Sequence, residues 1–154
     1  ISLPNLPLPL PLDLLPMPFH HEKLIVYQHP LEFAGWSQDL IESLTKKTST
    51  RDHLERDGDS VALNIAEGNG KFSQKDRARF FQIAHGSALE SAGCLDLLVA
   101  HRCCEPDAIV KGKLILEEIV KMLFTMLDRL GCRIAEDSGE YGMREEAEEE
   151  EEED

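Results

Sequence analysis

The sequence predicts an all-α protein, an antiparallel up-down-up-down four-helix bundle with an additional segment at each terminus. Three observations favour this fold. Apolar residues recur at helical spacing through four stretches of the chain, and no stretch shows the alternation of polar and apolar residues that is typical of a strand. The connections between the four stretches have only about three to five residues, which favours antiparallel neighbours. The length of 154 residues allows one such domain with a sizeable core.

Composition divides the chain into three parts. Residues 1–18 hold six of the eight prolines, which remove backbone donors and prevent a helix, so we expect a disordered leader there. Because the chain begins with Ile and Met17 directly precedes the first globular-looking sequence, we expect residues 1–16 to be either part of such a leader or an upstream translation artefact. Residues 19–135 are expected to form the bundle. Residues 136–154 carry twelve acids and one base, which predicts a disordered acidic tail.

The net charge of −14 belongs mostly to this tail, because residues 19–135 hold fifteen basic and seventeen acidic residues and are nearly neutral. A near-neutral domain argues against nonspecific nucleic-acid binding, which requires a basic surface. The leader lacks Lys and Arg, and its apolar run is broken by prolines, so no signal peptide is expected. No apolar run is long enough to span a membrane, and we expect no membrane partner. Four cysteines without a signal predict reduced thiols in the cytoplasm.

The first two predicted helices lie before the middle of the chain. The first runs from about His29 to Lys47, with Pro30 in its first turn and the lysines at its end placed favourably for the helix dipole. The second runs from about Arg51 to Glu67. It is followed by the GNG run, Gly68 to Gly70, which is a signal for the end of a helix.

The third and fourth helices have clear boundaries in the sequence. Ser73 is the expected N-cap of the third helix, with Asp76 three residues later as in a capping box, and this helix runs to about Arg102. The fourth helix follows Pro106 and ends at Gly131. Its apolar band is broader than one stripe, which predicts self-association. The expected contact residues of the oligomer are Ile115, Ile119, Met122 and Met126.

The residues predict no catalytic, metal or cofactor site, and we expect a protein that is not an enzyme. No Glu-x-x-His or Cys-x-x-Cys pair occurs, and HEKLI at His21 lacks the second histidine of a zinc-binding helix because Ile25 stands there. GNGKFS lacks the first glycine of a phosphate-binding loop, whose place is taken by Ile65. His85 is interpreted as a core or interface histidine ahead of a catalytic base.

The segment from Ser60 to Ala100 resembles the four-helix-bundle proteins encoded in intervening sequences of bacterial 23S ribosomal RNA. The resemblance extends over about Phe19 to Leu130 and rests on the FFQIAHGSALE segment and on the NIAEG motif. That motif, with the glycine that follows it, comprises Asn64, Ile65, Ala66, Glu67, Gly68 and Gly70. Members of this family look like small antiparallel bundles that assemble into rings, commonly pentamers, without an assigned activity. The resemblance therefore implies a homo-oligomer, most simply a pentamer.

A related branch of the family, the accessory variability proteins of diversity-generating retroelements, binds a reverse transcriptase and RNA through basic surfaces. This relation implies an alternative function as a nucleic-acid or ribonucleoprotein accessory module. Arg56 is followed by Asp57 where the family often has paired arginines, which argues against inherited binding. The basic residues expected at one end of the bundle, and so the candidate nucleic-acid contacts, are Lys23, Lys71, Lys75, Arg77, Arg79, Arg129 and Arg133.

Two further expectations concern charges at this end of the bundle. A carboxylate near a helix C-terminus is unfavourable by about 0.3–1 kcal/mol, so we expect Glu67 to pair with Lys71 or Arg77. The NIAEG motif is accordingly interpreted as structural ahead of a ligand site. The acidic tail leaves the bundle at the same end, which suggests that it screens the basic residues from nucleic acid; the simpler alternative is that it only confers solubility.

Overall fold

The computed structural model describes residues 25–132. These residues form four α-helices and one 3-10 helix, and they contain no strand, so the all-helical prediction is confirmed for this part of the chain. The expectations for residues 1–18 and 136–154 lie outside the described residues. In chain order the helices are α1 (Ile25–Ser43), α2 (Ser49–Asn69), α3 (Gln74–Ala100), η3 (Pro106–Ile109) and α4 (Val110–Arg129).

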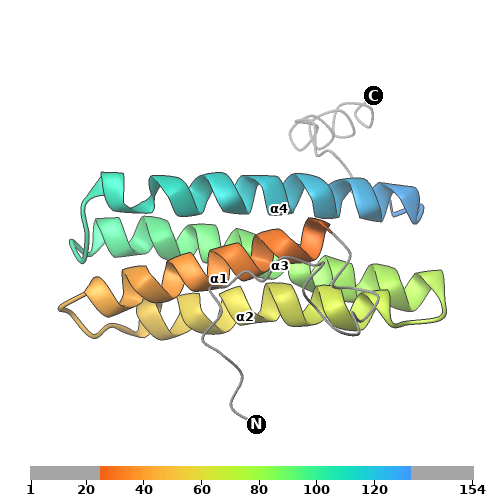
Figure 1. Ribbon diagram of the computed structural model, residues 1–154, viewed down its shortest axis with the longest axis horizontal. Helices are drawn as coiled ribbons and strands as arrows, with labels where there is room; N and C mark the ends of the chain where they lie inside the picture. Colours follow the sequence, from red (N-terminus) through yellow and green to blue (C-terminus); the bar gives the residue numbers. More distant parts are fainter. Residues whose placement is uncertain (1–24, 133–154) are drawn as a thin grey trace, which may run out of the picture.

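Figure 1 shows the four α-helices side by side along the long axis of the molecule. The connections α1–α2 and α3–α4 lie at one end, and the connection α2–α3 lies at the opposite end, together with the last turn of α4. Both α2 and α4 pack against α1 and α3, so each helix has two neighbours. The core between them is built from apolar side chains of all four helices, among them Phe33, Leu54, Phe81 and Leu123, which are buried.

Helix α1 lies about one turn earlier in the sequence than predicted. It begins at Ile25 and ends at Ser43, so Pro30 lies inside the helix rather than in its first turn. Proline there removes only the hydrogen bond to the carbonyl of Val26. Since Val26 and Pro30 are buried on the same face as Phe33, packing of this additional turn offsets that loss. The lysines that were expected at the end of α1 lie beyond it, in the α1–α2 connection.

Helix α2 extends past its predicted end. It continues through Gly68 and Asn69, and Gly70 follows as the C-cap. The backbone of Gly70 is right-handed, with φ −83°, so this glycine does not provide the left-handed turn that commonly ends a helix. Its N–H instead donates to the carbonyl of Glu67 at 3.1 Å, and the N–H of Lys71 donates to the carbonyl of Gly68 at 3.2 Å.

Two of the predicted helix boundaries are confirmed. The Oγ atom of Ser73 accepts a hydrogen bond from the backbone N–H of Asp76 at 3.1 Å and caps α3. At the end of α4, Gly131 has φ 80°, and the N–H of Cys132 donates to the carbonyl of Leu127 at 3.0 Å, as in a glycine-terminated helix. The start of the fourth helix differs from the prediction, because the 3-10 helix η3 occupies the four residues from Pro106 and α4 begins at Val110.

Arg102 ends α3 in a way that the sequence did not suggest. It has φ 59°, the left-handed region that glycine usually occupies after a helix. The N–H of Cys103 donates to the carbonyl of Leu98 at 2.8 Å and closes the same type of turn as at Gly131. Helix α3 therefore ends at Ala100, two residues before the predicted end.

Candidate functional site

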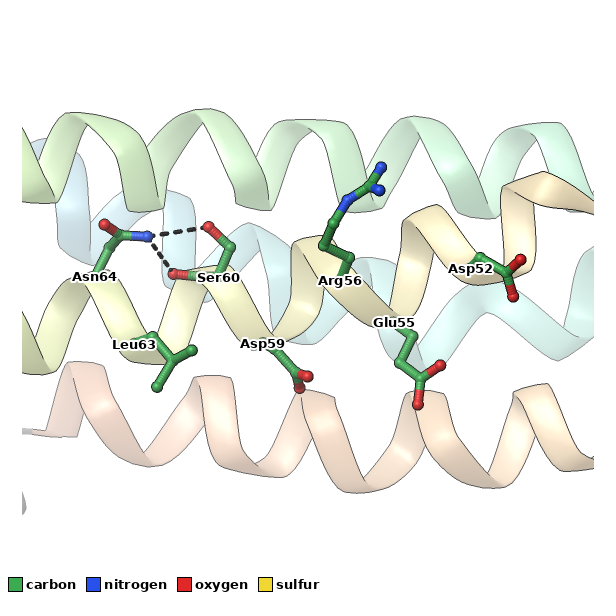
Figure 2. Close-up of a pocket in the computed structure, with 7 residues that line it drawn as sticks. All are labelled: Asp52, Glu55, Arg56, Asp59, Ser60, Leu63 and Asn64. Atoms are coloured by element: carbon green, nitrogen blue, oxygen red, sulfur yellow. Dashed lines mark hydrogen bonds between the residues drawn. The ribbon is translucent and has the colours of Figure 1, made fainter.

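The NIAEG motif lies in the last turns of α2, where this helix packs against α3. The Nδ2 atom of Asn64 donates to the backbone carbonyl of Ser60 at 2.8 Å and to its Oγ atom at 3.0 Å (Figure 2). The Oγ atom of Ser60 lies 2.9 Å from the Oγ atom of Ser87 on α3, and Ser91 donates to the Ser87 carbonyl at 2.9 Å. The two sequence motifs are thus joined by one continuous hydrogen-bond network across the α2–α3 interface.

The other residues of the motif set the distance between the two helices. Ile65 is fully buried, and Ala66 is half-buried beside it. A Cβ atom at Gly68 would lie 2.8 Å from Cε1 of Phe81, which is closer than real Cβ atoms approach, and 3.0 Å from Cβ of Phe80, which is a tight contact. Glycine is therefore required at this position by the close approach of α3.

The expected partner of Glu67 is confirmed as Lys71. The Nζ atom of Lys71 lies 3.2 Å from Oε1 of Glu67 and 4.8 Å from the centre of the Phe80 ring. Both charged side chains are well exposed, so this pair contributes at most about 1 kcal/mol to stability. The motif packs α2 against α3, and Asn64 also lines a groove.

The groove beside Asn64 runs along the outer face of α2 and has a volume of about 530 Å³. Figure 2 shows Arg56 and Ser60 on the side toward α3, and Glu55 and Asp59 on the opposite side of the helix. All its lining residues come from α2, so the groove is an open surface rather than an enclosed pocket. The lining residues are Asp52, Glu55, Arg56, Asp59, Ser60, Leu63 and Asn64.

Two titratable groups of α3 have pKa values that are shifted by burial. The Cys94 thiol on α3 donates to Oδ2 of the buried Asp57 on α2 at 3.9 Å. Burial, followed by the charges of Asp57 and Glu90, raises the pKa of the Cys94 thiol, so this cysteine stays protonated and is a poor nucleophile at neutral pH. Burial lowers the pKa of His85, which is half-buried on α3 and therefore neutral at pH 7.

No metal-binding cluster is found in the described part of the chain. Among residues 25–132, no three His, Cys, Asp or Glu side chains gather to hold an ion. The cysteines Cys94, Cys103, Cys104 and Cys132 are free thiols. None of the helices from α1 to α4 is both long enough and apolar enough to cross a lipid bilayer.

The structure brings together most of the predicted basic residues at one end of the molecule. Four of them, Lys71, Lys75, Arg77 and Arg79, lie in the α2–α3 connection and the first turns of α3. Arg129 is in the last turn of α4, and Figure 1 places that turn at the same end. We call these five residues the basic end. The other two predicted contacts, Lys23 and Arg133, lie outside the described residues.

The cations of the basic end differ in their partners. Lys71 pairs with Glu67, whereas Lys75, Arg79 and Arg129 are exposed and have no ion pair within residues 25–132. The Nε atom of Arg77 is buried and has no hydrogen-bond partner in that range. The carboxylates at this end are Glu67, Asp76 and Asp128, so the local excess of positive charge is two.

The predicted oligomer contacts on α4 need a correction. Ile115 and Ile119 are only 7% and 0% exposed, and they belong to the core of the single subunit, where a second copy could not contact them. Met122 and Met126 are half-buried against the same core. The buried part of the apolar band of α4 is explained by its two neighbours, because α4 packs against both α1 and α3.

A different apolar surface remains exposed between α3 and α4. Leu89, Val110 and Leu114 are 52%, 53% and 59% exposed, and they line a groove of about 540 Å³ together with Ala92 and Pro106. We call these five residues the apolar groove. Leu89 and Val110 were missed as contact residues from the sequence. The sequence did contain a sign of these two contact residues, because each is a large aliphatic residue outside the buried stripe of its helix.

Comparison with known proteins supports the fold. A protein with unknown function from the S23 ribosomal protein family of Bacteroides thetaiotaomicron has a crystal structure that matches with a TM-score of 0.63 and 24% identity, over 67% of this chain and 98% of that chain. A search of curated proteins gives no match. The sequence pattern of the 23S rRNA-intervening sequence proteins matches residues 22–125, more than half of the chain. The chain therefore belongs to the 23S rRNA-intervening sequence protein family.

Proposed function

We propose that the protein is a non-enzymatic scaffold that assembles into a homo-oligomeric ring through the apolar groove. The observation that carries this proposal is the clustering of Leu89, Val110 and Leu114, all more than half exposed, around one groove. Contiguous apolar surface of this kind is costly in water and usually marks an interaction site. The free thiols of the described chain suit the reducing environment of the cytoplasm, where we place the scaffold.

A ring requires two different contact surfaces on each subunit, because only a head-to-tail interface repeats around an axis. Leu63 offers the second surface. It is 67% exposed on α2, the helix diagonally across from α4, and it borders the groove shown in Figure 2. The family resemblance makes five the expected number of subunits. In this arrangement Leu63 of one copy contacts the apolar groove of the next.

Sedimentation velocity at micromolar concentration tests the scaffold. We expect the wild type to sediment as a closed oligomer, and Leu114→Glu to sediment as a folded monomer, because a lone carboxylate in an apolar contact costs several kcal/mol, on the order of 3. Leu63→Glu should dissociate the ring as well, whereas a two-fold contact between two apolar grooves would survive that change. Ile25→Glu, at an exposed position at the start of α1 that lines neither groove, is the matched control. A monomeric wild type, or an intact oligomer of Leu114→Glu, would overturn the proposal.

The second candidate function is RNA binding by the basic end. It is favoured by Lys75 and Arg79 in the first turns of α3, where the helix dipole also attracts anions, and by Arg129 in the last turn of α4. All three side chains are exposed and lack ion pairs within the described range. The name of the family refers to 23S rRNA, so RNA is the nucleic acid to test first. The same surface would serve a ribonucleoprotein module, as in the reverse-transcriptase-associated branch that the sequence resembles.

Fluorescence anisotropy with a labelled single-stranded RNA of about 20 nucleotides tests this second function across a salt series. The double variant Lys75→Glu and Arg79→Glu should weaken binding at least about tenfold at low salt and flatten its salt dependence, because two phosphate contacts are reversed. Lys46→Glu with Lys47→Glu makes the same charge change at the opposite end of the molecule and should have little effect. Equal losses in both double variants would show that binding follows only net charge and would overturn this candidate.

A further inference from the structure

We propose that the acidic C-terminal segment, residues 136–154, binds the basic end of its own chain and competes there with polyanions. The contact itself is independent of any function in RNA binding. Only its regulatory consequence, the exclusion of RNA, rests on the second candidate function. The proposal is built from the position at which the described chain ends, from charge complementarity and from the unpaired cations at that position.

The described chain ends beside the basic end. Helix α4 closes at Gly131, and Figure 1 shows this turn at the same end of the molecule as the α2–α3 connection. Glu136 follows Cys132 by four residues, and an extended chain spans at most about 3.3–3.6 Å per residue. The Cα atom of Glu136, the first acidic residue of the segment, therefore lies within about 14 Å of the Cα atom of Cys132, whatever path the chain takes.

The two charge distributions are complementary. Residues 136–154 hold twelve carboxylates and a single base, Arg144. The basic end holds five cations against three carboxylates, and one of these, on Glu67, is already paired with Lys71. Lys75 and Arg79 also lie in the first turns of α3, where the helix dipole disfavours cations unless an anion approaches. A tethered polyanion removes this unfavourable charge and meets its partner at high effective concentration.

The far end of the molecule provides an internal comparison. Lys46 and Lys47 are exposed in the α1–α2 connection, at the opposite end of the helices. Helix α3 has 27 residues, so the two ends are separated by about 40 Å at a rise of about 1.5 Å per residue. A fully extended chain of residues 133–154 could span that distance. Cross-links at Lys46 and Lys47 therefore report contacts made without the advantage of proximity to the tether point, and charge variants are needed to separate attraction from proximity at the basic end.

The test is zero-length carbodiimide cross-linking of the full chain, read by peptide mass spectrometry. A cross-link forms an amide between a lysine Nζ atom and a carboxylate in direct contact with it. We expect cross-links from residues 136–154 to Lys75 at low salt, and at least about a fivefold lower yield near 0.5 M salt, where the Debye length is only a few ångströms. Mixing isotope-labelled and unlabelled chains separates contacts within one chain from contacts between subunits.

Charge variants separate attraction from proximity. Arg79→Gln with Arg129→Gln leaves Lys75 as the reporter, and the yield at Lys75 should fall at least about threefold because two attracting charges are gone. Lys46→Gln with Lys47→Gln removes the same charge at the far end and should leave the yield unchanged. A yield at Lys75 that resists both salt and the arginine changes, or equal yields at Lys46 and Lys75 in the wild type, would overturn the proposal.

The consequence for RNA is measured on a second full-length variant, in which the seven residues from Glu148 to Asp154 are changed to Gln or Asn. If the segment occupies the basic end, this variant should bind the labelled RNA at least about tenfold more tightly than the wild type at low salt. Salt-sensitive cross-links without RNA binding by either chain would confirm the contact and reject the RNA function. RNA binding without such cross-links would confirm the RNA function and overturn the proposed contact.

Discussion

Replacing Ile119 with glutamate is expected to unfold the subunit rather than release a folded monomer. Ile119 is 0% exposed in the middle of α4, and its side chain packs in the core that α4 shares with its neighbours. A lone carboxylate buried there costs several kcal/mol, on the order of 3 or more, in addition to the lost packing of the isoleucine. Small domains have only about 5–15 kcal/mol of stability, so circular dichroism should show a greatly lowered melting temperature or no helical fold at 25 °C.

Two variants serve as controls for this prediction. Ile119→Val removes one buried methylene and should cost only about 0.5–1.5 kcal/mol. Leu114→Glu, one turn and a residue earlier on the exposed side of α4, should keep the fold and its melting curve while it affects assembly. A folded, monomeric Ile119→Glu protein would contradict the assignment of Ile119 to the core of the subunit and return it to the oligomer interface.

Replacing Gly112 with alanine should destabilise the fold, although alanine favours a helix more than glycine does. A Cβ atom at Gly112, in the first turn of α4, would overlap the six-membered ring of Trp36 on α1. The indole or the helix has to move, and overpacking of this kind costs about 1–3 kcal/mol. This cost exceeds the gain in helix propensity of about 1 kcal/mol, and urea denaturation should show a lower midpoint with an unchanged slope.

The matched control is Gly35→Ala in the middle of α1. A Cβ atom at Gly35 has nothing within 4 Å, so only the helix propensity changes and the protein should be stabilised by up to about 1 kcal/mol. Trp36→Phe should rescue Gly112→Ala, because the smaller ring leaves room for the methyl group, and a double-mutant cycle should show a favourable coupling between the two changes. If Gly112→Ala gains stability as Gly35→Ala does, the close contact with Trp36 is absent in solution.

The sequence by itself determined the features that depend on a few neighbouring residues. Ser73 was identified as the N-cap of α3 because its hydroxyl needs only the N–H of Asp76, three residues later. Gly131 was identified as the end of α4 because a left-handed residue suits glycine. The helix dipole predicted a basic partner for Glu67, either Lys71 or Arg77, and the structure shows Lys71, which is one turn away. In each case the interacting groups lie within a few residues of one another, so the sequence contains both partners.

The tertiary structure alone decided which neighbour covers each residue. Helical periodicity indicates that a residue is buried, but not by what, so Ile115 and Ile119 were assigned to a second copy although α1 and α3 already cover them. The network from Asn64 to Ser87 and the contact of Gly112 with Trp36 join residues 23 and 76 positions apart along the chain. Such contacts depend on the relative rotation and separation of the packed helices, and these follow only from the simultaneous fit of all the side chains in the core.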